Sequence, residues 1–294
     1  MKAHTIMNQS DFSRPPVYTK YFEFFRVDGY DLLDTAFALR YQVYCEERGF
    51  LDPARYPAHI ERDVYDETAV HFIGRHRLRC MAAGTARLVL SSHQGFPLQA
   101  HCDFNREFSF VRKPGHPALR DYAEISRLAV SKFFRQRADD SVYGGPSRPG
   151  TVSEGASAAA GLGLSPEEAG PEIVAGLFKS MYHEIKRLGV THVIVAMERS
   201  LHLLLRRLGY QFRAMGPVVD YYGPVIPYIA RIGDLEHHLY VRRRAVFDYW
   251  MEGLEPQYLP ALPLRGAPVR VPPRAIVVTP GKRRQSAPDA KERE

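Results

Sequence analysis

The stretch DYAEISRLAVSKFFRQR, residues 121–137, predicts a buried strand that runs into a basic, aromatic turn. The strand part is mostly apolar, yet Glu124 and Arg127 lie within it. Ionisable side chains are rarely buried unless they are paired or functional. Residues three apart on a regular strand point to opposite faces, so a direct pair between these two would require a β-bulge. We therefore expect one to face a pocket and the other to hold the framework.

The composition of the 294 residues is typical of a globular protein, with 45% hydrophobic and 25% charged residues. No apolar run is long enough to predict a membrane span, and the first 16 residues lack the apolar core of a secretory signal. The three cysteines, Cys45, Cys80 and Cys102, give neither a zinc spacing nor a disulfide framework. These observations predict a cytoplasmic protein.

The net charge of +7 is concentrated near the end of the chain. Residues 256–294 hold eight Lys/Arg and three Asp/Glu, so the other residues carry only +2. Nucleic-acid binding would therefore depend on this Pro/Arg-rich tail, and we expect none for the folded part. We predict that the tail, a leader at 1–16 and a Gly/Ser/Pro-rich insertion at 138–171 are disordered.

The pattern between the leader and the tail predicts one mixed α/β domain at 17–255, with helices on both faces of one sheet. Apolar alternation and short apolar runs predict strands at 17–27, 69–76, 81–90, 121–130, 190–197, 210–215 and 225–232. Apolar spacings of three and four predict helices at 31–48, 172–188, 201–208 and 234–251. Asp31 is a plausible N-cap, and Gly84 within a strand predicts a bulge or a close backbone approach.

A helix is predicted between the strands at 121–130 and 190–197, which makes a strand–helix–strand crossover. We therefore expect these strands to be parallel neighbours that diverge at their carboxyl ends. The segments at 51–68 and 91–120 show no regular pattern and are expected to be irregular.

Three acids and three bases in four segments are candidates for one site: Arg40, Asp63, Asp66, Arg87, Glu124 and Arg127. Surface ion pairs are the alternative for each of them. An amine nucleophile is protonated at neutral pH and must lose a proton before it attacks a carbonyl, so Glu124 is suited to act as a general base. The alternative is a buried glutamate satisfied by backbone groups and an arginine.

The histidines and cysteines give no metal site or nucleophile. His71, His183, His192 and the pair His237 and His238 lack ligand-like spacing. Cys45 stands beside two glutamates, which raise a thiol pKa and disfavour nucleophilic attack.

Four segments resemble the acyl-homoserine-lactone synthase-like branch of the GNAT acyltransferase fold. They are ALRYQVYCEERGF at 38–50, ERDVYDETAVHFIG at 61–74, GTARLVL at 84–90 and EISRLAV at 124–130. Within this branch, the chain looks most like the PEP-CTERM/exosortase system-associated acyltransferases and the N-acyl amino acid synthases. The resemblance covers residues 30–137 and implies a single GNAT-like domain. Its sheet would be mixed and mostly antiparallel, with a splayed parallel strand pair.

The resemblance also assigns roles. It makes Glu124 and Arg127 catalytic and places the following residues around the acceptor pocket: Arg40, Tyr44, Phe50, Asp63, Asp66 and Arg87. Tyr44 and Phe50 stand where autoinducer synthases have Phe and Trp, which puts homoserine-lactone synthesis in doubt and leaves acyl transfer.

On the donor side, FFRQR runs into the insertion where common GNAT enzymes have a glycine-rich coenzyme A turn. Arg135 and Arg137 would instead meet the phosphate of a carrier's phosphopantetheine or acidic side chains of the carrier. The alternative for both is a solvated basic end of the strand. Backbone N–H groups near Leu128, Ala129 and Val130 would stabilise the oxyanion.

The resemblance thus implies an N-acyltransferase that moves a fatty acyl group to the amine of an amino-acid-like acceptor. The donor would be an acyl-phosphopantetheine thioester on acyl carrier protein, or acyl-CoA, with no permanently bound cofactor and no metal. Two alternatives remain open: an acyl-homoserine-lactone-type signal synthase, and a non-catalytic acyl-carrier or lipid-binding module.

Overall fold

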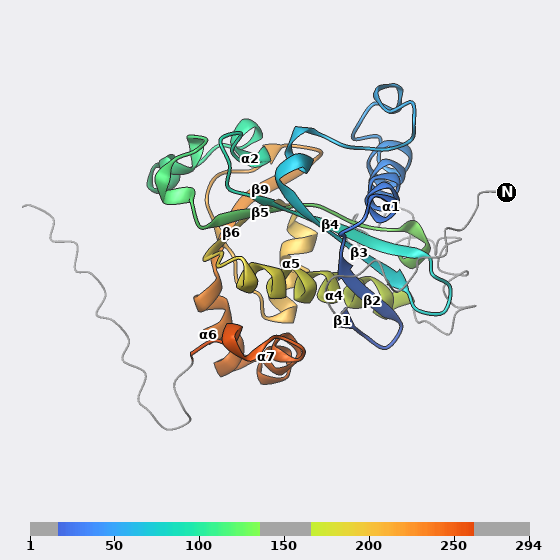
Figure 1. Cartoon of the computed structure of the whole chain (residues 1–294). Coiled ribbons are helices and arrows are strands. Elements are labelled where there is room, and N and C mark those ends of the chain that lie inside the picture. Colours follow the sequence, from blue (N-terminus) through green and yellow to red (C-terminus); the bar gives the residue numbers. More distant parts are fainter. Residues whose placement is uncertain (1–16, 136–165, 262–294) are drawn as a thin grey trace, which may run out of the picture. The chain divides into compact units, whose positions relative to one another are not determined.

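A nine-stranded sheet organises the part of the chain that the computed structural model describes, residues 17–135 and 166–261, without the side chains of 166–168 (Figure 1). Its strands are β1 Val17–Tyr18, β2 Phe22–Arg26, β3 Ala69–His76, β4 Ala82–Leu90, β5 Tyr122–Val130, β6 His192–Met197, β7 Arg213–Ala214, β8 Val219–Asp220 and β9 Pro224–Arg231. The order across the sheet is β1-β2-β3-β4-β5-β6-β9-β7, and β8 pairs with β9 outside this path.

The strands β5 and β6 form the one parallel pair among the described residues. They pair only where Tyr122, Ala123 and Glu124 lie opposite residues 192–194 of β6. Beyond Glu124 the two strands are no longer paired, so the sheet is split towards their carboxyl ends. The predicted pair of diverging parallel strands is confirmed, as is the mixed, mostly antiparallel sheet.

Helices lie on both faces of this sheet. They are α1 Tyr30–Tyr41, α2 Pro97–His101, α4 Pro166–Arg187, α5 Arg199–Leu208, α6 Ile232–Arg242 and α7 Arg244–Met251. Helix α4 packs along β2 to β5, whereas α1 lies on the opposite face over β3 to β5 (Figure 1). No helix of the described residues combines the length and the apolar character needed to cross a bilayer.

Several boundaries differ from the prediction. The strand at 17–27 is interrupted by a turn, and the helix at 234–251 breaks at Arg243 into α6 and α7. Helix α1 is capped by Gly29, so Asp31 lies in its first turn and is not the N-cap. Helix α4 starts at Pro166, inside the range 138–171 that was expected to be disordered, because proline and glutamate suit a first helical turn. The leader, the rest of the insertion and the tail beyond 261 lie outside the described residues.

The segment at 91–120 is a packed cap, although it was expected to be irregular. It contains α2 and 3₁₀ turns at Arg106–Arg112 and Pro117–Leu119. Its apolar side chains form a core cluster with β4, β6 and the segment before β8: Val89, Phe96, Leu98, Cys102, Phe104, Phe108, Val111, Leu119, Ile194 and Met215. The segment lacks a helical or strand-like apolar period, and the burial of its apolar side chains against one side of the sheet orders it instead. The cap also covers the strand that carries Glu124.

The contact between α4 and β2 depends on glycine. The ring of Phe24 is fully buried, and a Cβ added to either Gly74 or Gly176 would overlap it. We predict that Gly176→Ala lowers the free energy of unfolding by about 1–3 kcal/mol through overpacking, although alanine favours a helix. Gly233→Ala in α6 is the control, since no atom lies within 4 Å of its added Cβ. Thermal unfolding of both variants checks this, and equal melting temperatures would contradict it.

Candidate active site

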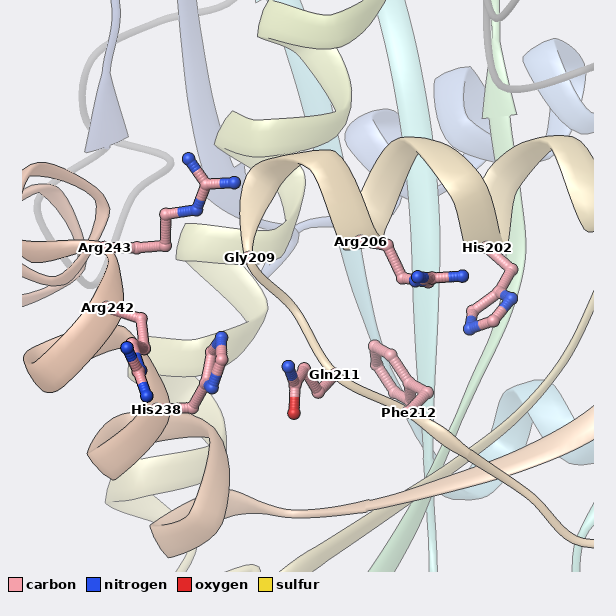
Figure 2. Close-up of a pocket in the computed structure, with 8 residues that line it drawn as sticks. All are labelled: His202, Arg206, Gly209, Gln211, Phe212, His238, Arg242 and Arg243. Atoms are coloured by element: carbon pink, nitrogen blue, oxygen red, sulfur yellow. The ribbon is translucent and has the colours of Figure 1, made fainter.

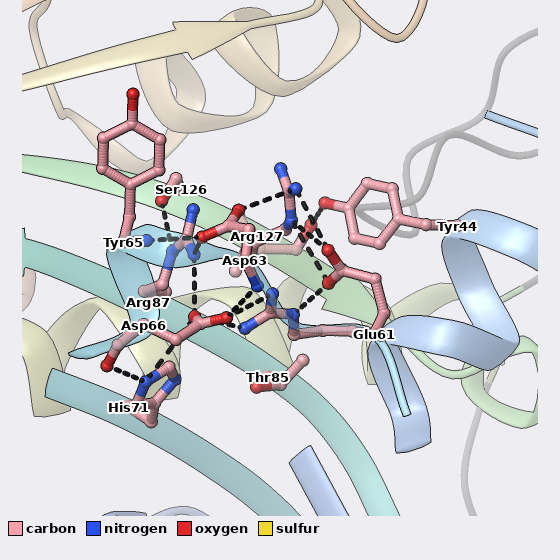
Figure 3. Close-up of polar contacts among 12 residues, drawn as sticks. Tyr44, Glu61, Asp63, Tyr65, Asp66, His71, Thr85, Arg87, Ser126 and Arg127 are labelled. Atoms are coloured by element: carbon pink, nitrogen blue, oxygen red, sulfur yellow. Dashed lines mark hydrogen bonds and ion pairs between the residues drawn. The ribbon is translucent and has the colours of Figure 1, made fainter. Parts of the chain in front are cut away.

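Six charged side chains form a closed ring of ion pairs on the α1 face of the sheet (Figure 3). Acids and bases alternate around it in the order Arg40, Glu61, Arg127, Asp63, Arg87, Asp66 and back to Arg40. The three bases come from α1, β4 and β5, and the three acids come from the loop before β3. The ring has no net charge and ties four segments together.

Asp66 links two of the arginines. Its two oxygens accept from Nη1 and Nη2 of Arg40 at 2.7 and 3.1 Å, which is a bidentate pair. Nη1 of Arg87 donates to Oδ1 of Asp66 at 2.7 Å and to Oδ1 of Asp63 at 2.6 Å. Nε of Arg87 donates to the hydroxyl of Ser126 at 3.0 Å. Arg87 is thus fixed between the loop and β5.

Glu61 closes the other half of the ring. It accepts from Nε of Arg40 and, at 3.1 Å, from Nη2 of Arg127. The same Nη2 donates to Oδ2 of Asp63 at 3.0 Å. The Arg127 guanidinium also lies over the rings of Tyr44 and Tyr222, at 5.5 and 5.3 Å from their centroids.

Local hydrogen bonds shape the loop that supplies the acids. Asp63 precedes a 3₁₀ turn at Val64–Thr68, and its Oδ1 accepts from the backbone N–H of Tyr65 at 2.9 Å. The N–H of Asp63 donates to Oδ2 of Asp66 at 2.7 Å. These bonds satisfy the free backbone donors at the start of the turn and aim both carboxylates at the arginines.

The ring is buried, and its ion pairs keep the carboxylates charged despite that burial. Arg40, Glu61 and Arg87 are almost fully buried. Burial opposes the charge on Glu61, but Arg127 and Arg40 outweigh it and hold the pKa of that carboxyl below its usual value. For Asp66, burial is likewise outweighed, chiefly by Arg40, and the pKa is lowered. Groups held ionised in this way are suited to structure, not to proton transfer.

A β-bulge places Arg127 in the ring. In the β4–β5 register, Thr85 pairs with Ala129 and Arg87 with Ser126, so one residue of β4 faces two of β5. Arg127 has a φ of 50°, a left-handed conformation that is uncommon for residues other than glycine. Because of the bulge, the side chains of Ser126 and Arg127 both reach the ring on the α1 face of the sheet. The bulge does not bring Arg127 into an ion pair with Glu124, since the partners of Arg127 are Glu61 and Asp63.

Glu124 stands outside the ring. Its side chain is buried, and its Oε2 accepts from the backbone N–H of Leu98 at 2.9 Å. Burial raises the pKa of Glu124 to about 8, against the opposing effects of the Leu98 hydrogen bond and of Arg87. A carboxyl that exchanges its proton near neutral pH is suited to general acid–base chemistry.

Glu124 and Arg127 meet at a pocket of ≈ 50 Å³, where β5 and β6 diverge. Its lining comes from the segment that follows α1, from β5, from the end of β6 and the residue after it, and from the β8–β9 hairpin: Tyr44, Phe50, Glu124, Ile125, Ser126, Arg127, Ala196, Glu198, Tyr221, Tyr222 and Val225. A space of this size holds only a few waters, so a larger ligand requires movement of the lining.

The structure places the predicted acceptor residues in two groups. Tyr44 and Phe50 line the pocket. The ring members Arg40, Asp63, Asp66 and Arg87 do not appear in its lining; they form a layer behind Arg127. Their effect on the pocket is therefore indirect, through the position of Arg127.

The predicted donor residues fall elsewhere. Leu128, Ala129 and Val130 are buried in β5, and the carbonyl of Leu128 accepts from the hydroxyl of Tyr44 at 3.2 Å. Arg135 is buried and ion-paired with Glu47, so the alternative of a solvated basic end does not hold for it, and its predicted role at the donor stays a prediction. Arg137 lies outside the described residues.

Sequence reasoning missed four residues of this site: Glu61, Glu198, Tyr221 and Tyr222. The signal for Glu61 was its place in ERDVYD, directly before the two ring aspartates. The signal for the tyrosines was an aromatic pair beside a glycine in a loop, where exposed rings commonly serve binding. Tyr222 has a φ of 58°, and its ring lies 6.3 Å from that of Phe50.

Burial shifts the pKa values of Cys45 and His71 away from neutral pH. Burial and then Glu61 raise the pKa of Cys45 to about 11, so the predicted direction is right but burial is the larger cause. Burial lowers the pKa of His71 to about 4. Within the described residues, no group of three or more His, Cys, Asp or Glu side chains is arranged to hold a metal ion.

Comparison with known proteins identifies the fold. Residues 39–143 match the family of acetyltransferase (GNAT) domains. The structure of TofI in a ternary complex with an inhibitor and MTA superposes with a TM-score of 0.50 and 19% identity, over 80% of this chain and 99% of that one. FeeM, an N-acyl amino acid synthase from uncultured soil microbes, superposes with a TM-score of 0.46 and 14% identity, over 74% of this chain and 93% of that one. The AHL synthase LasI superposes with a TM-score of 0.45 and 13% identity, over 72% of this chain and 89% of that one. No curated protein matches.

These findings confirm a single GNAT-like α/β domain with a mixed sheet. At these identities the solved structures show the fold alone.

The raised pKa of Glu124 makes stability depend on pH. The folded chain holds this proton up to about pH 8, whereas the unfolded chain releases it near 4.5, so the wild type loses stability between these values as pH rises. Glu124→Gln cannot ionise and escapes this loss. The melting temperature of the variant relative to wild type should therefore be higher at pH 9 than at pH 5. Glu67→Gln changes an exposed residue, so its melting temperature should depend on pH as that of the wild type does. If the melting temperature of Glu124→Gln also followed the wild type at both pH values, the raised pKa of Glu124 would be refuted.

Proposed function

We propose that this GNAT-like protein is an N-acyltransferase that moves a fatty acyl group from a thioester donor to the amine of an amino-acid-like acceptor. The observation that carries the proposal is Glu124, a buried carboxyl with a raised pKa that lines the pocket where β5 and β6 diverge. This strand lies within the stretch that matches the GNAT domain family. The sequence resemblance to N-acyl amino acid synthases supports the acceptor class.

The acceptor would bind between charges of opposite sign. Arg127 is the one guanidinium in the pocket lining and is suited to the acceptor carboxylate. Glu124 and Glu198 supply carboxyls for the ammonium group. Glu124 accepts a proton from this group, and the freed amine attacks the thioester carbonyl. The new C–N bond forms, the C–S bond breaks, and the second amine proton leaves with the thiol.

The oxyanion formed in this attack requires donors on β5. Beyond Glu124, the edge of β5 that faces β6 has no ladder partner there, so backbone N–H groups on that edge are available. We assign this role to the backbone near Leu128, Ala129 and Val130. The hydroxyl of Tyr44, whose pKa burial raises to about 12, stays protonated and fixes the carbonyl of Leu128.

An apolar cavity on the α4 face is suited to the acyl chain. Its ≈ 20 Å³ are lined by Ile125, Phe178, Met181, Tyr182, Ile185, Val193, Tyr210, Phe212, Ile232, Leu235 and Trp250. Ile125 lines both this cavity and the polar pocket. A chain that enters where the strands diverge would thus pass Ile125, and the cavity would widen as side chains move.

The donor is proposed to be carried by acyl carrier protein, with acyl-CoA as the alternative. Arg135, one of the two arginines expected to meet the carrier, is buried and ion-paired with Glu47. The association with a PEP-CTERM/exosortase system stays a prediction of the sequence resemblance.

The test incubates the purified chain with dodecanoyl carrier protein or dodecanoyl-CoA and a panel of amino acids, followed by mass spectrometry. An N-dodecanoyl amino acid supports the proposal, and the better donor settles the carrier. An acyl-homoserine lactone as product would favour the signal-synthase alternative. Binding of the thioester without any product would favour a non-catalytic acyl-binding module.

Glu124→Gln should lower kcat by about 100-fold, the usual contribution of a positioned base. In the wild type, kcat/KM should rise with pH until Glu124 is ionised, near pH 8, and this rise should be absent from the variant. Glu67→Gln is the control for loss of one exposed negative charge. Near-normal turnover of Glu124→Gln, with an unchanged pH profile, would remove Glu124 from the chemistry.

Ile185→Ala should shift the preference towards longer acyl chains, because it enlarges the apolar cavity. Each additional buried methylene is worth about 0.8 kcal/mol, so the kcat/KM ratio of a longer to a shorter donor should rise about fourfold per methylene. Leu188→Ala, an exposed position just after α4, is the control. An unchanged chain-length profile in a folded Ile185→Ala protein would show that the chain lies elsewhere.

A further inference from the structure

A second and larger cavity, of ≈ 680 Å³, lies at the far end of α5 from the polar pocket (Figure 2). Glu198, which lines the polar pocket, directly precedes α5, whereas Gly209, which lines the second cavity, directly follows it. Ten helical residues separate the two by about 15 Å. The lining consists of His202, Arg206, Gly209, Gln211, Phe212, His238, Arg242 and Arg243.

This lining is cationic without compensation. Arg206 lies in the last turn of α5, and Arg242 and Arg243 end α6, while no acidic residue of the described part of the chain lines the cavity. Across the described ranges, no carboxylate forms an ion pair with any of these three. Nearby Arg213 and Arg244, by contrast, pair with Glu107 and Asp248. Three arginines around one cavity repel each other, and an anion relieves this repulsion.

Two histidines lie beside the arginines in this cavity. His202 projects from α5, and His238 from α6 on the other side of Gln211 (Figure 2). Burial and then Arg206 lower the pKa of His202. Burial and then Arg242 lower the pKa of His238. A bound anion would favour protonation of both, which adds donors for it.

Gly209 shapes the cavity. Its φ of 95° ends α5 in a left-handed conformation. A Cβ at this position would lie 2.7 Å from Cγ of Arg243, so the absence of a side chain lets the Arg243 stem pack on the backbone. The end of α6 is thereby held against the end of α5, and the cationic groups of the two helices share one cavity.

An aromatic cavity of ≈ 460 Å³ adjoins the cationic one, and Gln211 and Phe212 line both. Its wall includes Phe108, Phe110, Tyr122 and His192. The rings of Tyr122 and His192 are stacked, with centroids 4.5 Å apart and an angle of 12° between their planes. Each of these two rings covers one face of the other, so a flat heterocycle would stack on the opposite face of the pair or on Phe108 or Phe110. The amide of Gln211 can donate and accept hydrogen bonds where the halves join.

We propose that the two cavities together form a binding site for a nucleoside phosphate. The phosphates bind the arginines of the cationic cavity, and the base stacks in the aromatic cavity. Arginine suits this task, because its planar fork matches phosphate oxygens. The proposal does not depend on the acyl-transfer reaction.

The test is calorimetric titration of the full chain with ATP, pyrophosphate and adenosine. ATP should bind more tightly than either fragment. Arg206→Gln and Arg242→Gln should each lower the affinity for ATP and for pyrophosphate at least tenfold. Arg207→Gln is the matched control, since it removes an exposed arginine on the same helix that does not line the cavity. Phe110→Leu should lower the affinity for ATP but not the affinity for pyrophosphate. Circular dichroism checks that each variant is folded.

Four results would overturn the proposal. ATP at millimolar concentration could fail to bind, or could bind equally to wild type and to the folded double variant Arg206→Gln/Arg242→Gln. Pyrophosphate could bind as tightly as ATP, which would leave the aromatic half without a role. A thymidine oligomer could bind where ATP does not, which would assign the surface to single-stranded nucleic acid.

Discussion

The ring of six alternating charges is the interaction on which the site depends. It replaces water around three arginines, of which Arg40 and Arg87 are almost completely buried. Removal of one member of a buried pair typically costs 3–5 kcal/mol, because the remaining charge is left uncompensated. Since every member of the ring serves two neighbours, the loss of one disturbs α1, the acidic loop, β4 and β5 together. The ring also occupies the nearby cations, so among the described residues Glu124 has no ion-pair partner, and burial can raise its pKa.

The sequence was sufficient for most of the fold but not for the pairing within the site. Apolar runs identified the central strands, and the crossover rule identified β5 and β6 as parallel neighbours. The charged positions were recognised as a group, yet Glu124 was placed in the set in place of Glu61. The true partners depend on the bulge at Arg127, and a left-handed arginine leaves no signal in residue spacing. The cap at 91–120 was missed because contacts with distant strands, not periodicity, order it.

A short π-helix determines the ion-pair partner of Glu47. Arg40 and Glu47 are seven residues apart and would share a face of a regular α-helix. The turn Gln42–Glu47 is π-helical, so its wider spacing rotates Glu47 away from Arg40. Glu47 then pairs with Arg135, and Arg40 is left to the acidic loop. One local change of helical pitch thus influences both the ring and the position of Arg135, which the sequence resemblance assigned to the donor side.

Phe212 lines the cationic cavity, the aromatic cavity and the apolar cavity. One ring therefore forms a shared wall between the surface of the protein and the space proposed for the acyl chain. A wall shared in this way links two equilibria: a ligand that displaces Phe212 changes the room for an acyl chain, and the chain changes the affinity for that ligand by the same factor. The length of chain that the protein accepts would then depend on the composition of its surroundings as well as on its sequence.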